Sequence, residues 1–200
     1  MREAATSFTF YYDVVCPYAY LASTQVETAA ARAGAEIEWV PVLLGGIFRA
    51  IGQEDVPARA MPPVKQHLNL LDMKRYAAYY GVPLTLHPRH PLRSLDAMRL
   101  LHTVAGAQRV ALTKALYHAH FVDNRDISDR AILADYGDVS RLDSADIKGA
   151  LRAATDRAVA DGAFGVPAFV VEQQGRRFLF WGQDRLFFVE KALGGWTVPV

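Results

Sequence analysis

Residues 8–23 read FTFYYDVVCPYAYLAS, and this stretch decides the fold. Its first residues alternate between two faces, which predicts a β-strand from about Ser7 to Tyr12. A turn then leads to Cys16. Pro17 suits the first position of a helix, because proline lacks the N–H that would be unpaired there. The order of strand, turn and helix predicts that Cys16 follows a strand directly and lies at the amino end of a helix.

The next segments extend this unit. Small and apolar residues at helical spacing predict that the helix continues to Ala33, and Gly34 is a natural stop. Alternation over Glu36 to Val40 then predicts a second strand. Strand, helix and strand in close succession indicate the start of an α/β layer.

The middle and the end of the chain differ in pattern. From about 62 to 162, apolar residues recur at helical spacing between proline-rich interruptions, which predicts several helices. After residues 165–167, two apolar runs around a turn at 173–175 predict a hairpin, and a helix is expected to begin near Asp184. The resulting order is β-α-β, helices, β-β-α.

The chain has 200 residues, of which 52% are hydrophobic and 22% charged, so it can form a substantial core. No linker separates its parts, and the helical block therefore resembles an insertion into one sheet domain. We expect one unit over residues 1–200, with the sheet core at about 1–55 and 163–200 and the helical insertion at about 56–162.

Charge and hydropathy exclude some function classes. Lys and Arg number 22 and Asp and Glu number 21, which gives a net charge of +1 and no overall field for nucleic acid or an anionic membrane. The first residues lack the pattern of a signal peptide, and no apolar run is long enough to span a membrane. We therefore expect a cytoplasmic protein that binds neither nucleic acid nor membrane.

Cys16 is the only cysteine, which excludes an intrachain disulfide and a metal site built from several thiolates. At the amino end of a helix, unpaired N–H groups and the macrodipole favour an anion. This position can lower the pKa of the Cys16 thiol, or it can stabilise a thiolate that a ligand brings. The alternative is a buried cysteine that packs as a small hydrophobe. The sequence position favours a functional role.

The remaining polar motifs do not predict a metal site. His118 and His120 lie two residues apart in a predicted helix, so they face different sides, and we interpret them as ordinary helix residues. The acidic segment 123–129 lacks the glycine and the terminal glutamate of a calcium-binding loop. It more simply ends one helix and caps the next.

Val166-Pro167 precedes an apolar strand, and Cys16-Pro17 follows another. These two features occur together in thioredoxin-like domains. The chain resembles the thioredoxin-superfamily branch that contains DsbA-like proteins, kappa-class glutathione transferases and 2-hydroxychromene-2-carboxylate isomerases. The matching stretches are FTFYYDVVCPYAYLAS at 8–23, LLGGIFRAIGQ at 43–53, MPPVKQHLNLLDMKRYAAYYGVPL at 61–84, FGVPAFVV at 164–171 and FWGQDRLFFVEKALGG at 180–195. This resemblance implies an α/β, thioredoxin-like (DsbA-like) sheet domain with an inserted all-helical subdomain.

The residues around Cys16 separate two chemistries within this branch. Disulfide-exchanging DsbA-like proteins usually carry Cys-x-x-Cys, whereas this chain has Ala19 at the position of the second, resolving cysteine. Kappa-class transferases and chromene isomerases usually read Asp-x-x-Ser-Pro-Tyr, with the serine hydroxyl beside the thiol of bound glutathione. The chain matches this frame from Asp13 to Tyr18, with Cys16 in place of the serine.

The resemblance implies a glutathione site in which Cys16 faces the sulfur of glutathione. Val166 precedes Pro167, the expected cis-proline. Its backbone would pair with the cysteinyl unit of glutathione as a short added strand.

The two ends of glutathione would bind to other segments. The resemblance implies that Gln53 and Lys65 hold the glycyl end. Gln183 and Asp184 would hold the γ-glutamyl end, with the Asp184 carboxylate pairing with the ammonium group. Each of these residues also has a structural interpretation, as a loop residue, a solvated helix charge or a helix cap.

Our leading hypothesis is a glutathione-dependent isomerase of the 2-hydroxychromene-2-carboxylate type, or a kappa-like transferase. The bound thiolate would act as nucleophile on an unsaturated, aromatic-derived substrate. Tyr18 and Phe48 would form an apolar wall for this substrate, and Arg89 or Arg93 would contact its carboxylate. The resemblance also implies a homodimer.

Two alternatives stay open. The protein could be a monothiol DsbA-like thiol–disulfide oxidoreductase, in which Cys16 itself attacks disulfides. It could also be a non-enzymatic thioredoxin-like module that binds extended peptides by strand addition.

Overall fold

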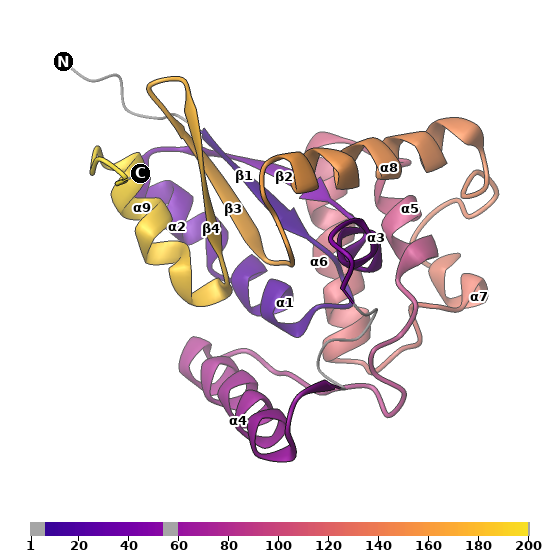
Figure 1. The fold of residues 1–200 in the computed structure, drawn as a ribbon. Helices are drawn as coiled ribbons and strands as arrows, with labels where there is room; N and C mark the ends of the chain where they lie inside the picture. The colour runs from indigo at the N-terminus through magenta and orange to yellow at the C-terminus, as the bar shows by residue number, and fades with distance from the viewer. Residues whose placement is uncertain (1–6, 54–59, 200) are drawn as a thin grey trace.

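The computed structural model describes residues 7–53 and 60–199. The centre of the fold is one four-stranded sheet (Figure 1). Its strands are β1 (Ser7–Tyr12), β2 (Glu36–Pro41), β3 (Ala168–Gln173) and β4 (Arg176–Trp181), in the spatial order β2-β1-β3-β4. β1 pairs in parallel with β2 and antiparallel with β3, which pairs antiparallel with β4. The carboxyl ends of β1, β2 and β4 therefore meet the start of β3 at one edge.

The strands confirm the pattern predicted from the sequence. β1 occupies the expected residues, and β2 is one residue longer than predicted. Gln174 and Gly175 form the hairpin turn between β3 and β4, with φ angles of 54° and 71°. Two residues with positive φ give a turn whose twist fits the twist of the adjoining strands.

Helices lie on both faces of the sheet. They are α1 (Pro17–Ser23), α2 (Val26–Ala33), α3 (Leu44–Ala50), α4 (Pro63–Tyr80), α5 (Leu95–Leu101), α6 (Gly106–Phe121), α7 (Arg130–Leu133), α8 (Ala145–Ala160) and α9 (Leu186–Leu193), and the 3₁₀ turn η2 (Gln183–Arg185) precedes α9. α2 and α9 pack together on one face, and α8 lies over the other (Figure 1). The element order agrees with the prediction of β-α-β, helices and β-β-α.

One predicted helix is two. The sequence pattern predicted a continuous helix to Ala33, but Thr24 and Gln25 separate α1 from α2. The Thr24 hydroxyl donates to the carbonyl oxygen of Leu21 at 2.8 Å, a local side-chain bond that competes with continued helix. The predicted stop at Gly34 is confirmed, with a left-handed φ of 62°.

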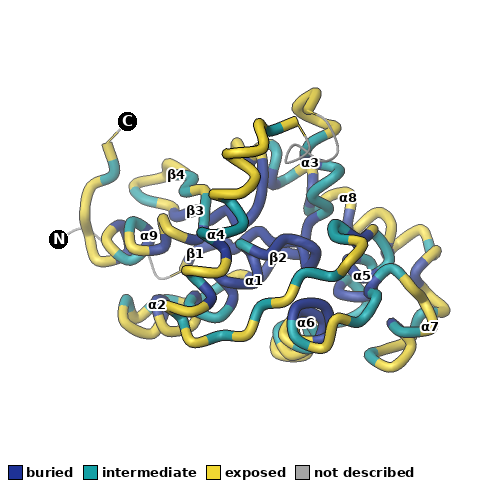
Figure 2. The backbone as a smooth tube through the Cα atoms, turned by 90° about the horizontal axis from the view of Figure 1, so that it is seen from below, coloured by how far each residue is buried: buried dark blue, intermediate teal, exposed yellow. Residues whose placement is uncertain are grey.

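The apolar core continues from the sheet into the helical segment. The ring of Phe10 stacks on Phe169 with centroids 5.3 Å apart, and Tyr12 lies 6.3 Å from Tyr117 of α6. Figure 2 shows the buried parts of β1, β2 and α1 adjoining those of α6. The sheet and the helices between β2 and β3 thus share one core.

A buried carboxylate joins three segments at the sheet edge. Asp13 follows β1 and is fully buried. Its Oδ1 accepts the N–H of Val15 at 3.1 Å, and its Oδ2 accepts the N–H of Leu44 and the hydroxyl of Ser94, each at 2.9 Å. Its carbonyl oxygen accepts the N–H of Cys16 at 3.0 Å. Burial raises the pKa of Asp13 to about 6, against the effect of these donors. Asp13 therefore fixes the turn that carries Cys16 against the starts of α3 and α5.

His118 and His120 both lie in α6 and face different sides of it, as predicted, but the sequence did not predict how deeply His120 is buried. Its side chain is fully buried in α6, with ring centroids 5.9 Å from His90 and 4.4 Å from Phe121. Neither ring nitrogen makes a well-formed hydrogen bond with the described residues. The backbone of Arg125 raises the pKa of His120, but burial lowers it more. Burial lowers the pKa of His120 to about 4.

We expect Asp13→Ala to lower the free energy of unfolding by about 3 kcal/mol or more, because three buried donors lose their acceptor and each costs about 1–3 kcal/mol. The matched control is Asp156→Ala on α8, where the carboxylate is exposed, and it should change stability by less than about 0.5 kcal/mol. Urea denaturation at pH 7 measures both. Equal losses in the two variants would contradict the role of Asp13 as a junction.

His120 should make folding sensitive to acid. Folded His120 takes up a proton only near pH 4, whereas the unfolded residue does so near pH 6.5, so acid favours the unfolded chain between these values. The free energy of unfolding should therefore rise by up to about 3 kcal/mol more for the wild type than for His120→Leu as pH increases from 4 to 6.5. Urea denaturation across this range measures the difference.

The control for this prediction is His118→Gln, two residues away on the exposed side of α6. It measures how the loss of an exposed histidine from the same helix changes the pH dependence. An identical pH dependence in His120→Leu and the wild type would show that His120 titrates normally in the folded chain.

Candidate functional site

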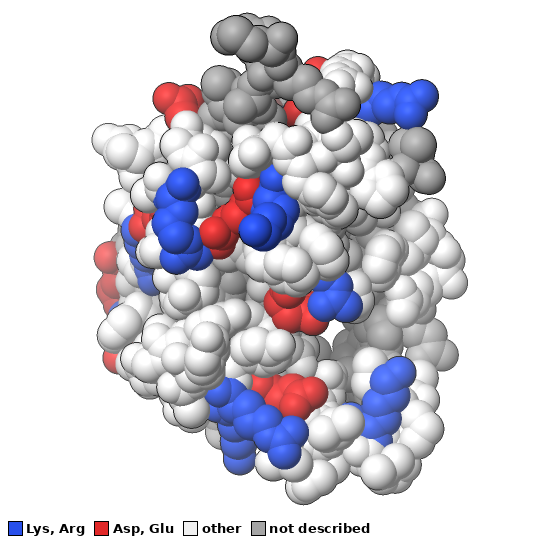
Figure 3. Space-filling model, turned by 90° about the vertical axis from the view of Figure 1, so that its left-hand side faces the viewer, with Lys and Arg blue, Asp and Glu red and all other residues white. Residues whose placement is uncertain are grey.

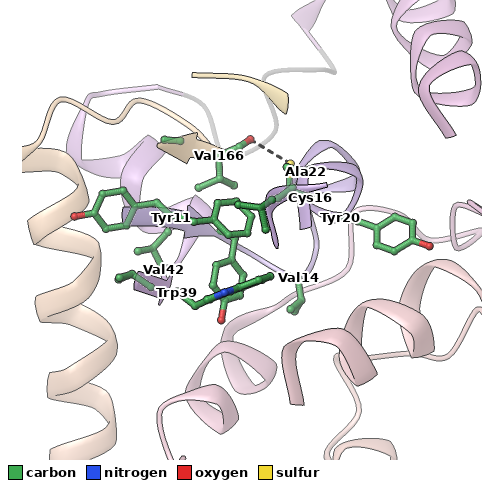
Figure 4. Packing of buried hydrophobic residues seen from close by; sticks show 14 of the residues in the cluster. Tyr11, Val14, Cys16, Tyr20, Ala22, Trp39, Val42 and Val166 are labelled. Atoms are coloured by element: carbon green, nitrogen blue, oxygen red, sulfur yellow. Dashed lines mark hydrogen bonds between the residues drawn. The ribbon is translucent and has the colours of Figure 1, made fainter. Parts of the chain in front are cut away.

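The site lies at the sheet edge where β1 ends and β3 begins (Figure 4). Cys16 is the residue that caps α1, in an extended conformation with φ −87° and ψ 116°. Its thiol donates to the carbonyl oxygen of Val166 at 3.3 Å. The Val166–Pro167 peptide bond is cis, and the carbonyl oxygen of Pro167 accepts the N–H of Gly182 at 3.0 Å. Three segments that are distant in sequence therefore meet at the start of α1.

The Cys16 thiol is buried, with 8% of the residue exposed. Burial raises its pKa to about 12, although the N–H groups of Ala19 and Tyr18 act in the opposite direction. The helix terminus lowers this pKa less than burial raises it, because the loss of hydration outweighs the effect of one short helix. The thiol is neutral at pH 7.

Tyr18 connects α1 to α4. Its hydroxyl donates to Asn69 Oδ1 at 2.7 Å, and it is half-buried. Burial raises the pKa of Tyr18 to about 12, with smaller contributions from Asp72, from the Cys16 sulfur and from Asp184. These electrostatic effects indicate that both carboxylates and the Cys16 sulfur lie near Tyr18.

Apart from Lys65, the residues that α4 contributes to the site were not predicted from the sequence. Asn69, Asp72, Tyr76 and Tyr80 recur at helical spacing, and this polar face is the signal that could have identified them. Tyr80 reaches the other side of the site, where its hydroxyl donates to Gln183 Oε1 at 2.5 Å.

Gln183 and Asp184 lie in η2, directly after the contact between Gly182 and Pro167. Gln183 is 4% exposed, and Asp184 forms an ion pair with Arg185. Asp184 does not cap α9 as expected, because α9 begins two residues later. Gly182 has a φ of 104°, and a Cβ there would lie 2.6 Å from the Asp184 carboxylate, so the turn requires glycine.

The two residues predicted for the glycyl end of glutathione are distant in sequence from Val166 and from η2. Gln53 is exposed after α3, and its N–H donates to the carbonyl oxygen of Phe48 at 2.8 Å. Lys65 is exposed in the first turn of α4, and its side chain has no ion-pair partner within 7–53 and 60–199. Residues 54–59, between these two positions, lie outside the described part of the chain.

The two arginines predicted to contact a substrate carboxylate differ in their ion pairing. Arg89 forms an ion pair with Asp126. Arg93 is exposed, and it is next to Ser94, whose hydroxyl bonds to Asp13. The structure brings neither arginine into direct contact with Cys16.

Other surface features lie away from Cys16. Hollows of about 320 Å³ and 310 Å³ border α9, and both include Trp196 in their lining, whereas neither includes Cys16. On the face drawn in Figure 3, basic and acidic side chains are interspersed. Among residues 7–53 and 60–199 there is no group of three or more His, Cys, Asp or Glu side chains that could hold a metal ion, and no helix with the length and hydropathy of a membrane span.

The chain is similar to proteins of one family along most of its length. The family model for the DSBA-like thioredoxin domain matches residues 8–194. A 2-hydroxychromene-2-carboxylate isomerase from Sphingobium xenophagum is 32% identical over 193 residues, which cover 92% of this chain and 96% of the relative. Glutathione S-transferase kappa 1 from Rattus norvegicus is 24% identical over 221 residues, with 100% and 96% of the two chains covered.

Solved structures show the same fold. A structure of a 2-hydroxychromene-2-carboxylate isomerase superposes with a TM-score of 0.78 at 24% identity, and 94% of each chain is covered. The cytosolic disulfide reductase DsbM from Pseudomonas aeruginosa, solved with GSH, has a TM-score of 0.59 at 17% identity, covering 94% of this chain and 93% of that one. The chain therefore belongs to the DSBA-like thioredoxin domain family, together with 2-hydroxychromene-2-carboxylate isomerases and kappa-class glutathione transferases.

Proposed function

We propose that the protein is a glutathione-dependent isomerase of the 2-hydroxychromene-2-carboxylate type. The observation that carries this proposal is the state of Cys16. It occupies the serine position of the isomerase and transferase frame, and it is a buried, neutral thiol that already donates a hydrogen bond, to Val166. A neutral S–H can serve as the serine hydroxyl would, as a donor to the sulfur of bound glutathione. Relatives named as isomerases and glutathione transferases support this function.

Bound glutathione would supply a thiolate that adds to an unsaturated carbon of the substrate, permits rotation about the resulting single bond, and leaves unchanged. The start of α1 would stabilise the anionic sulfur through the Cys16 thiol and the N–H groups of Tyr18 and Ala19. The backbone of Val166 would pair with the cysteinyl unit.

The same proposal assigns the ends of the ligand to different segments. Gln53 and Lys65 would hold the glycyl carboxylate, since an exposed ammonium and an amide are suitable donors. Gln183 and Asp184 would hold the γ-glutamyl group. This donor set fits glutathione, because the chain offers partners for its carboxylates, its ammonium group and its thiolate.

An aromatic-derived substrate would lie against Tyr18 and Phe48, which are partly exposed. Arg93 is the better candidate for a substrate carboxylate. Its side chain has no ion-pair partner within the described segments, whereas Asp126 neutralises Arg89.

The second candidate function is thiol–disulfide exchange through Cys16, because solved structures of similar fold include disulfide reductases. Only the thiolate attacks a disulfide, and a thiol with a pKa of about 12 is thiolate in about one molecule in 10⁵ at pH 7. The burial of Cys16 therefore favours the role of hydrogen-bond donor over that of nucleophile.

The ionisation of Cys16 can be measured through alkylation by iodoacetamide, followed by mass spectrometry. We expect the rate to rise about tenfold for each pH unit from 7 to 10 without a plateau, since the thiolate fraction grows in this way below the pKa. Free glutathione, measured in parallel, should level off near pH 9. A plateau for Cys16 below pH 8 would contradict a neutral thiol and favour the redox function.

Replacement of the thiol separates the two enzymatic functions. Cys16→Ser should bind glutathione within about threefold of the wild type and isomerise 2-hydroxychromene-2-carboxylate at an equal or higher rate, because a hydroxyl is the stronger donor. Cys16→Ala should lower kcat at least about tenfold, because the donor to the sulfur is lost. Calorimetry and steady-state kinetics measure these quantities.

Two outcomes would reject this proposal. Loss of activity in Cys16→Ser with retained folding would indicate that the sulfur itself reacts. Absence of glutathione binding to the wild type, together with binding of extended peptides, would instead indicate a peptide-binding module.

A further inference from the structure

α4 is attached to the site mainly by polar contacts. Within this helix only Met73 and Ala77 are buried, and Figure 1 shows it beside α1, apart from the sheet. Tyr18 of α1 donates to Asn69, and Tyr80 at the end of α4 donates to Gln183 of η2. The two hydrogen bonds attach α4 to both sides of the site around Cys16.

The bond from Tyr80 fixes the direction of the Gln183 amide. The Tyr80 hydroxyl donates to Gln183 Oε1 at 2.5 Å, so the amide oxygen is the group that faces Tyr80. The amide nitrogen, Nε2, must then point to the opposite side. Among the described residues no acceptor for Nε2 is found, and Nε2 is not one of the fully buried polar atoms that lack a partner, so this atom is accessible to a ligand.

The next residue, Asp184, supplies an acceptor for a positively charged group. Asp184 follows Gln183 in η2, and its carboxylate acts on both Tyr18 and Tyr80. An amino-acid group carries a carboxylate, which needs N–H donors, and an ammonium, which needs an anionic acceptor. The Gln183 Nε2 and the Asp184 carboxylate provide this pair on adjacent residues.

We propose that Tyr80 is a positioning residue that holds Gln183 as a hydrogen-bond donor to the γ-glutamyl carboxylate of bound glutathione. This inference rests on the proposed glutathione-dependent function and adds a residue of the helical segment to the ligand site. The competing explanation is that the Tyr80–Gln183 bond only attaches α4 to η2.

Two substitutions distinguish these explanations. Tyr80→Phe removes the hydroxyl and leaves the amide free to rotate. Gln183→Glu keeps an acceptor for Tyr80 but replaces the N–H donors with a negative charge. The matched control is Tyr79→Phe, because Tyr79 is the neighbouring tyrosine, is 83% exposed, and donates no hydrogen bond within 7–53 and 60–199.

Titration calorimetry of the full chain should use glutathione, γ-glutamylcysteine and cysteinylglycine, the last of which lacks the γ-glutamyl group. Tyr80→Phe should raise Kd for the first two ligands about three- to tenfold, the effect of one hydrogen bond. Gln183→Glu should raise these values more than about tenfold, because two carboxylates then face each other. Binding of cysteinylglycine should not change in either variant, and Tyr79→Phe should match the wild type with all three ligands.

The outcomes separate this inference from the function on which it rests. Equal Kd values for Tyr80→Phe and Tyr79→Phe would overturn it, as would unchanged binding by Gln183→Glu or an equal loss for cysteinylglycine. A wild-type chain that binds none of the three ligands would overturn the proposed function and this inference together. Thermal unfolding of each variant checks that affinity changes do not reflect loss of folding.

Discussion

The contact between the Cys16 thiol and the Val166 carbonyl oxygen organises the site, because it joins the start of α1 to the segment before β3 at a point where the sulfur is buried. The increase in the pKa of Cys16 from 9 to about 12 corresponds to roughly 4 kcal/mol, whereas a helix terminus contributes at most about 2 kcal/mol. Desolvation therefore dominates. The consequence is a neutral donor at a position where sequence reasoning favours an anion.

The surrounding fold holds this contact in place. Asp13 secures the turn before Cys16 with hydrogen bonds to the starts of α3 and α5, and Gly182 bonds to Pro167 from the other side. Burial of the charged Asp13 carboxylate is unfavourable, and the three hydrogen bonds that it accepts offset only part of this free energy. Several elements thus converge on one edge of the sheet.

Local patterns predicted the elements that depend on neighbours in sequence. The alternation of β1, the proline at the start of α1 and the turn before β4 follow from residues a few positions apart. The Tyr80–Gln183 bond joins residues 103 positions apart, and the burial of His120 depends on how the loop around His90 packs, so neither has a local signal. The sequence left the ionisation of Cys16 open for the same reason, because burial, which raises its pKa, is a tertiary property.

We propose that Cys16 acts as a hydrogen-bond donor to the sulfur of glutathione and forms no covalent bond with it. A crystal structure of the protein with reduced glutathione tests this most directly. We expect the ligand sulfur within about 4 Å of Cys16 Sγ, with no bond between them and with the thiol turned from Val166 toward the ligand. A Cys16–glutathione disulfide under reducing conditions, or glutathione bound away from Pro167, would contradict the claim.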